Sequence, residues 1–389
     1  MKIIHTADWH IGAVLYGYDR REEHIAAFDA LKKIIQEEQP DVLLVCGDIF
    51  HNPRPSAAAQ SLFTKVLTGF KAVVPAMTIV VTAGNHDSPS LHEIFRDAWQ
   101  ELGVHAIGSA NGTDDELKEK LIVEVPGKCF IAAVPYLYDK STMAEKYRII
   151  LEEIAKINEA GLPVIAMAHA NVPFGEEDEK RDYVGAVEPC EIGTFGTGYD
   201  YLALGHIHRT AGIPGTNARY CGSIIPITFG EKSKRSVSKI EIERHGERPR
   251  ISTIEIATMK PVVSVPANGF KGWNDAIEEL KEYEAEGAAY VRLCINHNDE
   301  IPANATEIAS AICTEKGLDF CVLNYPTLDL QSRADGRQNL SIEEFKQMTP
   351  AEVAKMYVRD TGLEFNEDLE GLFTEVLDAL EAEKKGTEE

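Results

Sequence analysis

Five short apolar segments of this chain run directly into turns that carry aspartate, asparagine or histidine. Continuous apolar runs such as Asp41–Cys46 are typical of strands that are covered on both faces. Segments with helical periodicity lie between them, and this alternation predicts an α/β fold in which β-sheets are flanked by helices. The five turns are Asp8-Trp9-His10, Gly47-Asp48, Gly84-Asn85-His86-Asp87, His169 and Gly205-His206-Ile207-His208.

The polar side chains of these turns are candidate metal ligands. In parallel sheets the functional crevice lies outside the carboxyl ends of the strands, so we expect the five turns to converge. The spacing of Asp8 and His10, and of His206 and His208, places each pair on one face of its segment. The candidate ligands are Asp8, His10, Asp48, Asn85, His169, His206 and His208.

The types of side chain in this set indicate a metal centre that acts on phosphoesters. Oxygen and imidazole ligands without thiolate favour Mn²⁺, Fe²⁺ or Zn²⁺. A carboxylate such as Asp48 could bridge two ions about 3.5–4 Å apart, and such a pair clamps a phosphoryl group and activates a water. His86 would then remain to protonate the leaving oxygen. The sequence therefore predicts metal-assisted phosphoester hydrolysis.

These motifs, which occur in order from residue 8 to residue 208, resemble those of the calcineurin-like metallophosphoesterases. The resemblance implies a layered sandwich fold and two divalent ions, most typically Mn²⁺. It also implies that His86 is the proton donor and that Asp87 orients it. One ion would be held by Asp8, His10, Asp48 and His208, and the other by Asp48, Asn85, His169 and His206.

Two longer segments, His5–Gly12 and Tyr220–Glu231, are similar to the DNA nucleases of this superfamily that act in double-strand-break repair and recombination. That similarity implies exonuclease action on duplex DNA and endonuclease action on single strands or hairpins. It further implies a homodimer and an SMC-like ATPase partner. His51 departs from the pattern, because those nucleases commonly carry an acidic residue there.

The chain is expected to contain four parts. Residues 1–258 form the predicted nuclease domain, and residues 259–330 form a small α/β cap that contacts DNA. Residues 331–340 are a polar linker, and residues 341–389 are helices that bind the ATPase partner. Capping boxes at Ser341/Glu344 and Thr349/Glu352 mark the starts of those helices. The alternative is that the helices pack back on the chain's own domains.

The charge distribution constrains how such a protein would hold DNA. A net charge of −24 argues against a protein that coats nucleic acid or an anionic membrane. Residues 209–260 nevertheless hold ten basic and five acidic side chains. The basic residues expected to meet DNA phosphates are Arg209, Arg219, Lys232, Lys234 and Arg235.

Two further expectations concern location and assembly. A membrane span needs about 18 consecutive apolar residues, and the sequence has no such run. Its seven scattered cysteines contain no C-x-x-C pair, which favours reduced thiols and a cytoplasmic protein. The helices predicted around Ser56–Gly69 and Leu91–Leu102 could form a homodimer face, although packing into the core is the equal alternative.

Other functions fit the same motifs less well. Protein phosphatases with this site resemble each other in placing arginines beside the two glycine turns, where Ile49 and Ala83 lie here. A phosphodiesterase of small or cyclic nucleotides would not need the long C-terminal region, and it stays the alternative. A non-catalytic scaffold would be expected to have lost ligands, whereas this chain keeps all of them.

Overall fold

The computed structural model describes most of the chain. It covers residues 1–94, 96–174, 189–231, 233–285, 287–296 and 301–326, and six single residues beyond them. Those six are Thr349, Glu352, Val353, Lys355, Gly371 and Phe373. The chain divides into two compact units, Met1–Asn324 and Tyr325–Glu389.

The first six-stranded sheet has the order β14-β13-β1-β4-β5-β6. Strands β1, β4, β5 and β6 are parallel, and β13 and β14 extend the sheet in antiparallel fashion beyond β1. The strands are β1 (Lys2–Thr6), β4 (Val42–Cys46), β5 (Thr78–Thr82), β6 (Val104–Ile107), β13 (Arg235–Glu241) and β14 (Arg250–Ile256).

The second six-stranded sheet has the order β11-β12-β10-β9-β8-β7. Its central strands β8, β9, β10 and β12 are parallel, with an antiparallel strand at each edge. The strands are β7 (Ile122–Val125), β8 (Cys129–Ala133), β9 (Val164–His169), β10 (Tyr201–Gly205), β11 (Ala211–Gly212) and β12 (Ala218–Tyr220).

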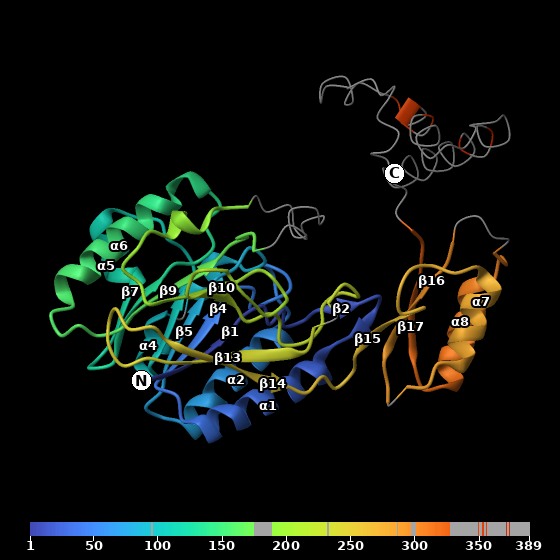
Figure 1. The fold of residues 1–389 in the computed structure, drawn as a ribbon, viewed down its shortest axis with the longest axis horizontal. Helices are drawn as coiled ribbons and strands as arrows, with labels where there is room; N and C mark the ends of the chain where they lie inside the picture. The colour runs from blue at the N-terminus through green and yellow to red at the C-terminus, as the bar shows by residue number, and fades with distance from the viewer. Residues whose placement is uncertain are drawn as a thin grey trace, which may run out of the picture. The chain divides into compact units, whose positions relative to one another are not determined.

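Helices cover the outer faces of the two sheets, which gives a four-layered sandwich (Figure 1). One hydrophobic cluster joins both sheets to α5 (Asp114–Leu121) and α6 (Met143–Ile157). A second cluster packs the first sheet against α1 (Arg21–Glu38) and α2 (Ala57–Val73). The shorter elements are β2 (Val14–Leu15), β3 (Tyr18–Asp19), α3 (Pro89–Glu93), α4 (Arg96–Glu101), η1 (Lys140–Thr142) and η2 (Ile192–Phe195).

A small three-stranded parallel sheet with two helices follows the sandwich. Its strand order is β15-β16-β17, and α7 and α8 connect the strands. The buried face of α7 carries Trp273, Ala276, Ile277 and Leu280, which accounts for its amphipathic sequence. The elements are β15 (Val262–Val265), α7 (Trp273–Glu282), β16 (Tyr290–Cys294), α8 (Ala305–Glu315) and β17 (Asp319–Asn324).

The layered α/β fold expected from the sequence is confirmed, and the apolar strand Asp41–Cys46 and the helix around Ser56–Gly69 lie within a few residues of β4 and α2. The apolar residues of Tyr220–Phe229 also predict a strand there, and that prediction is wrong, because β12 ends at Tyr220. The amides of Ile227 and Thr228 donate to the carboxylate of Glu231 instead of to a neighbouring strand. An apolar, β-branched stretch therefore forms a loop.

Much of the predicted C-terminal region lies outside the described residues. This holds for the linker 331–340, for the capping box at Ser341 and for almost all of 341–389. The second capping box is confirmed, since the Thr349 amide donates to Glu352 at 2.7 Å and the Glu352 amide donates to the Thr349 hydroxyl at 3.3 Å. Among the described residues, no helix has both the length and the apolar character needed to cross a membrane.

Candidate metal centre

The five polar turns meet at one edge of the sandwich, as the sequence predicts. They follow the carboxyl ends of β1, β4, β5, β9 and β10, which belong to both sheets. Backbone hydrogen bonds tie the turns together: the Asp8 amide donates to the Gly47 carbonyl at 3.0 Å, and the His10 amide donates to the Asp48 carbonyl at 2.9 Å. The edge of the sandwich thus holds the side chains in a fixed array.

The backbone at several ligand positions is strained. Asp8, His10, Asp48 and His206 have φ values of 50°, 47°, 49° and 100°. Within the described part of the chain, only Tyr16 and Gln39 are other non-glycine residues with positive φ. Such conformations cost of order 1–3 kcal/mol each and persist where surrounding structure imposes them. Their concentration at these four residues indicates a functional site.

Two glycines make room for the array. A side chain at Gly84 would collide with the Asp48 carboxylate, and one at Gly47 would collide with the His169 ring. Gly47 also has a φ of +81°, which an L-residue rarely adopts. The turns can therefore approach one another only because these positions lack a Cβ.

Asp8, His10 and His208 form one group of ligand atoms. The Nε2 atoms of His10 and His208 lie 3.0 Å apart. Two ring nitrogens at that distance need a proton or a cation between them, because two lone pairs would repel. The Nδ1 atom of His10 is buried and has no hydrogen-bond partner in the described structure, so the ring is directed toward this cluster through Nε2.

Asp48, His169 and His206 form a second group, which Asn85 completes. The Asn85 Oδ1 atom lies 3.0 Å from His169 Nε2 and 3.1 Å from His206 Nδ1. The Asp48 Oδ2 atom lies 3.4 Å from His169 Nε2 and 3.6 Å from His10 Nε2 of the first group. Asp48 is therefore within reach of both groups.

The donor set fits a pair of divalent ions. All donors are carboxylate, amide oxygen or imidazole nitrogen, which suits Mn²⁺, Fe²⁺ or Zn²⁺. The side chains come from five turns and are mostly buried, so the protein has gathered them despite their desolvation cost. The structure thus brings together all seven residues that the sequence singled out as ligands.

Burial and mutual charge perturb the titration of this cluster. Burial, reinforced by the charge of His169, lowers the pKa of His206 to about 3. Burial also raises the pKa of Asp8 to about 6, against the opposing charges of His169 and His208. Burial alone would lower the pKa of His169, but Asp48 raises it to about 9. Buried groups displaced from their ordinary pKa in opposite directions are typical of functional sites.

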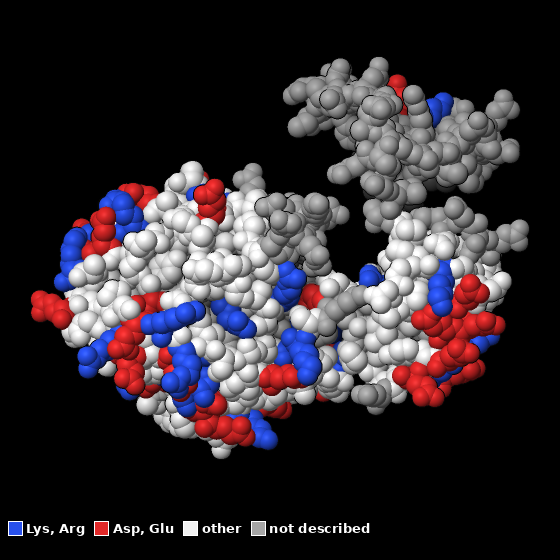
Figure 2. All heavy atoms as spheres, in the orientation of Figure 1, with Lys and Arg blue, Asp and Glu red and all other residues white. Residues whose placement is uncertain are grey.

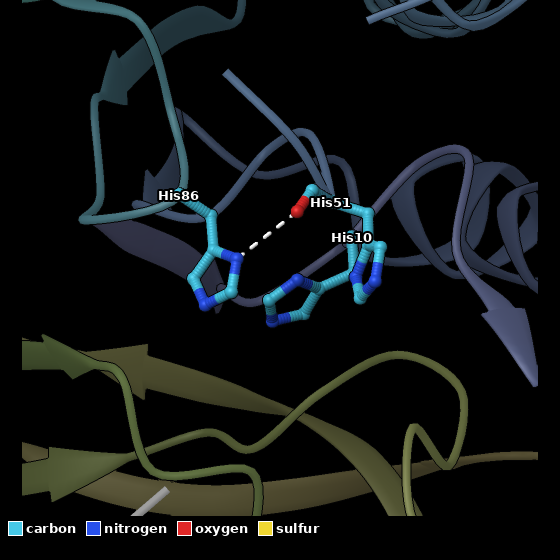
Figure 3. Close-up of side chains that lie close together, drawn as sticks. All are labelled: His10, His51 and His86. Carbon is cyan, nitrogen blue, oxygen red and sulfur yellow. Dashed lines mark hydrogen bonds between the residues drawn. The ribbon is translucent and has the colours of Figure 1, made fainter. Parts of the chain in front are cut away.

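Two further histidines, His51 and His86, lie beside the candidate ligand His10 (Figure 3). His10, His51 and His86 bring their ring nitrogens close together, and the rings of His51 and His86 are stacked at 5.9 Å. The Nδ1 atom of His86 lies 3.0 Å from the His51 carbonyl oxygen and donates to it. The other ring nitrogen, Nε2, is thereby left for substrate. The sequence did not assign His51 to the site, although its place three residues after Asp48 in the same turn was a usable signal.

Asp87 has a different place from the one expected. Its carboxylate accepts hydrogen bonds from the amides of Ile49 at 3.0 Å, Phe50 at 2.9 Å and Gly84 at 2.8 Å. It is 1% exposed, and the carbonyl of His51, not Asp87, accepts the hydrogen bond of the His86 ring. Asp87 therefore clamps the turn after β4 to the turn after β5 and does not orient the His86 ring directly.

A family profile described as calcineurin-like phosphoesterase matches residues 1–210. The SbcD component of the nuclease SbcCD from Rhodobacter capsulatus is 32% identical over 296 residues, which cover 69% of this chain and 72% of that protein. This chain belongs to the SbcD family of calcineurin-like phosphoesterases.

The SbcD proteins of other bacteria support this membership. Those of Escherichia coli K12 and Bacillus subtilis 168 are each 28% identical over 309 residues. The matches cover 72% and 73% of this chain, and 76% and 77% of those proteins. The resemblance noted in the motifs is therefore confirmed for the SbcD family, while the roles of single residues stay predictions.

Glu231 supports this SbcD-family site from behind one of the candidate ligands, His208. Its Oε1 atom accepts a hydrogen bond from His208 Nδ1 at 3.0 Å, which leaves Nε2 of that ring for the first ligand group. Its Oε2 atom accepts from Ser223 Oγ at 3.0 Å and from Arg235 at 2.8 Å. A carboxylate behind a ligating histidine fixes the tautomer and orientation of the ring. The sequence offered a signal for this role, because Glu231 is the only carboxylate in the segment Tyr220–Glu231.

The expected DNA-contacting residues are not equivalent. Arg235 is 2% exposed and is engaged with Glu231, Ser223 and the His208 carbonyl, so it lies inside the protein. Arg219 donates to Ser238 and Thr253, which links the edges of the two sheets. We therefore correct the expectation for Arg235, because a buried guanidinium cannot reach a DNA phosphate.

The remaining basic candidates lie nearer the surface. Lys234 is exposed and pairs with Glu255 at 2.9 Å, and the Arg209 guanidinium lies 4.5 Å from the centre of the Phe174 ring. Lys232 falls outside the described residues. Figure 2 shows acidic side chains gathered on the part with the small sheet, where α7 exposes Asp275, Glu278 and Glu282.

Proposed function

We propose that this protein is a metal-dependent DNA nuclease, an exonuclease on duplex DNA and an endonuclease on single strands and hairpins. The observation that carries this proposal is the position of Asp48 within reach of two ligand groups, with His86 beside them. That arrangement serves phosphoester hydrolysis, and the name of the relatives, a nuclease, supports DNA as the substrate.

Each side chain of the site has a place in this chemistry. Asp8, His10, Asp48 and His208 would hold one divalent ion, and Asp48, Asn85, His169 and His206 would hold the other. We expect Mn²⁺ in both positions. When bound, a pair of such ions would supply Lewis-acid polarisation of the phosphate and an activated water. Glu231 keeps His208 in the tautomer whose Nε2 faces the first ligand group.

His86 acts as the proton donor. Its Nδ1 hydrogen is committed to the His51 carbonyl, so the proton that leaves must come from Nε2. In the cationic form, the ring donates that proton to the leaving oxygen as the phosphodiester bond breaks. Asp87 keeps the His86 turn in place through the amides of Gly84 and of the neighbouring loop.

DNA would be held by a surface that is basic only in part. Arg209 and Lys234 are the candidates for phosphate contacts that the structure leaves near the surface, with Arg219 and Lys232 as further candidates. The exposed side of α7 is acidic, so we propose that the cap, residues 259–330, meets DNA through another surface. Because the whole chain carries −24, grip on DNA would depend on the partner proteins.

The proposed partners are an SbcC-type, SMC-like ATPase and a second copy of this chain. The name of the relatives, which makes them one component of SbcCD, supports the first of these. Residues 341–389 would bind the ATPase, and the helices around Ser56–Gly69 and Leu91–Leu102 would form the homodimer face. The domain division 1–258, 259–330 and 331–340 stays a prediction, as does a cytoplasmic location.

The chemistry can be tested on linear duplex and hairpin DNA, with Mn²⁺ or with EDTA. Cleavage should require the metal, and His86→Ala should slow it by about 10²- to 10⁴-fold because one proton transfer is lost. Mn²⁺ binding should be kept in that variant, and His105→Ala on β6 serves as the matched control. Cleavage in EDTA, or full activity of His86→Ala, would contradict the mechanism.

A second experiment separates the alternatives. If the wild-type protein hydrolyses only small or cyclic phosphodiesters, even with the ATPase partner present, the phosphodiesterase interpretation replaces the nuclease. Deletion of residues 341–389 should abolish co-purification with the ATPase and leave Mn²⁺ binding intact. Unchanged co-purification would refute the assignment of those residues.

A further inference from the structure

A short segment after β8 borders the metal centre on a side that the roles above do not use. The amide of Tyr136 donates to the Ala83 carbonyl at 2.8 Å, directly before the Gly84-Asn85-His86 turn. The Tyr136 ring lies 6.1 Å from the ring of the ligand His169, edge against face. The segment therefore runs beside two of the ligand turns.

Two tyrosines of this segment, Tyr136 and Tyr138, form a pair of rings that extends from the site to the solvent, here called the aromatic step. The rings of Tyr136 and Tyr138 meet edge to face at 5.0 Å, while Leu137 between them is buried. Tyr136 is half-buried, and Tyr138 is 68% exposed, the most exposed large hydrophobic side chain in the described residues. Full burial of a ring of this size contributes about 1.5–3 kcal/mol of free energy. An exposed ring beside a candidate active site therefore indicates a surface that a ligand covers.

The backbone that presents Tyr138 is held firmly. The Asp139 carboxylate accepts hydrogen bonds from the Ser141 amide at 3.0 Å and the Ser141 hydroxyl at 2.6 Å. The Thr142 hydroxyl also donates to the Asp139 carbonyl at 2.9 Å. These bonds start the turn η1, so the exposed ring stands on an ordered support and would need little ordering to bind a ligand.

The groups around the step suit a nucleotide whose phosphate sits at the metal centre. The Tyr136 ring contacts both the Tyr138 ring and the ring of His169, so the pair extends from the site itself. Lys140 stands two residues after Tyr138, at the start of η1. An aromatic pair next to a cation is the combination that single-stranded nucleic acids use for base and backbone.

We propose that Tyr136 and Tyr138 form a stacking platform for an unpaired nucleobase of the strand being cut, adjacent to the scissile phosphate. This inference rests on the proposed nuclease function and adds a specificity to it. A base inside a duplex has both faces covered by its neighbours, whereas an unpaired base can stack on the exposed Tyr138 ring. The platform thus favours single strands, frayed ends and hairpin loops.

The test compares two matched oligonucleotides with the wild-type protein and Mn²⁺. One is a single strand, and the other has the same sequence with a tetrahydrofuran abasic residue beside the cleaved phosphate. The base should lower the wild-type KM by roughly 10- to 100-fold, the range expected for loss of one stacking contact. Tyr138→Ala should remove this difference, and Tyr138→Phe, which keeps the ring, should retain it.

The matched control is Ile157→Ala. Ile157 is another exposed hydrophobic residue, 47% exposed, and it ends α6 shortly before the amino end of β9, the end opposite the site. This variant should discriminate between the two oligonucleotides like the wild type. Equal KM values for both oligonucleotides in the wild type, or full discrimination in Tyr138→Ala, would overturn the platform.

A binding measurement separates failure of the platform from failure of the proposed function. A single strand with 2-aminopurine in place of the stacked base is titrated with protein in EDTA, where no cleavage is expected. Quenching by the wild type and by Tyr138→Phe, but not by Tyr138→Ala, supports stacking even if no cleavage is seen with Mn²⁺. Cleavage by the wild type without any quenching overturns the platform and leaves the nuclease assignment standing.

Discussion

At the scale of single residues, several candidate ligands of this site hold backbone conformations that non-glycine residues usually avoid. Asp8, His10, Asp48 and His206 have positive φ, and His10 keeps a buried ring nitrogen without a partner in the described structure. Each feature lowers stability, and each occurs where the fold gathers the seven candidate ligands at one edge. The folded chain therefore carries strain and desolvation that metal binding would offset.

Glu231 should control metal affinity although it would not touch the ion. Glu231→Gln weakens the hold on the His208 ring, so we expect Mn²⁺ affinity to fall by about 10- to 100-fold. Titration of free Mn²⁺ by electron paramagnetic resonance measures this directly. Glu255→Gln is the control, since Glu255 pairs with Lys234 at the surface. Equal affinity in Glu231→Gln and wild type would show that the His208 ring needs no support.

His5 should make the fold sensitive to acid. Burial, with a smaller effect of Arg219, lowers its pKa from 6.5 to about 3. As the pH falls, His5 of the unfolded chain is protonated near pH 6.5, whereas His5 of the folded chain stays neutral until about pH 3. The contribution of neutral His5 to stability is therefore fully present above pH 6.5 and is lost as the pH falls toward 3. The free energy of unfolding should drop by about 1.4 kcal/mol per pH unit in that window.

The check is urea denaturation of wild type and His5→Asn at several pH values from neutral to acid. The variant has no titrating ring at this position, so its unfolding free energy should fall less steeply with decreasing pH. Parallel curves for the two proteins would mean that the acid sensitivity arises elsewhere.

At the scale of elements, the site depends on how closely the turns after neighbouring strands approach. The turn after β4 and the turn after β5 are joined by the Asp87 carboxylate and by the hydrogen bond from the His86 amide to Asp48 Oδ1 at 2.9 Å. Gly84 lies between them, and its missing side chain is what permits this approach. The strands direct the two turns to the same edge of the sheet, and the missing glycine side chain allows the final close approach of the two backbones.

Gly84→Ala should damage the site with only a moderate effect on the fold. The added Cβ would collide with the Asp48 carboxylate and amide, so we expect at least a 10-fold loss of Mn²⁺ affinity and a cost of about 1–3 kcal/mol in unfolding free energy. Gly193→Ala is the control, because nothing lies within 4 Å of its Cβ position and its φ is ordinary. Calorimetric Mn²⁺ titration and urea denaturation measure the two effects. Wild-type affinity in Gly84→Ala would contradict the steric argument.

At the scale of the whole molecule, the small sheet is joined to the sandwich by a buried charged cluster. Arg20 donates to both carboxylate oxygens of Glu23 and to the Pro226 carbonyl, and the Tyr290 hydroxyl of β16 donates to Glu23 at 2.8 Å. A second bond runs from the Tyr18 hydroxyl to the Phe320 carbonyl at 3.0 Å. The connection is thus polar and directional, which favours one mutual arrangement.

Removal of Glu23 should be far more damaging than removal of the Tyr290 hydroxyl. Glu23→Ala leaves the buried Arg20 guanidinium without its carboxylate, which typically costs about 3–5 kcal/mol. Tyr290→Phe removes one hydrogen bond to a charged group and should cost about 1.5–3 kcal/mol. Tyr18→Phe, which removes a bond to a neutral carbonyl, should cost about 1 kcal/mol. Urea denaturation would rank the three, and an equal effect of all three would argue against a charged anchor.

The sequence by itself determined the layered α/β class, most of the strands and helices, and the seven candidate metal ligands that the structure brings together. It could do so because apolar periodicity indicates locally which residues are buried. In addition, the polar residues of each candidate-ligand turn are close neighbours in the sequence. The capping box at Thr349 was predictable for the same reason, since its hydrogen bonds join residues only three positions apart.

Only the tertiary structure decided what depends on contacts between distant segments. Glu231 lies 23 residues from His208, Asp87 turned out to hold backbone amides from the turn after β4, and Arg235 proved to be buried. The stretch after Tyr220 reads locally as a strand, yet a single carboxylate captures its amides. Local pattern fixes which side of an element is buried, but the partners of a polar group are chosen by whatever the fold brings within hydrogen-bonding distance.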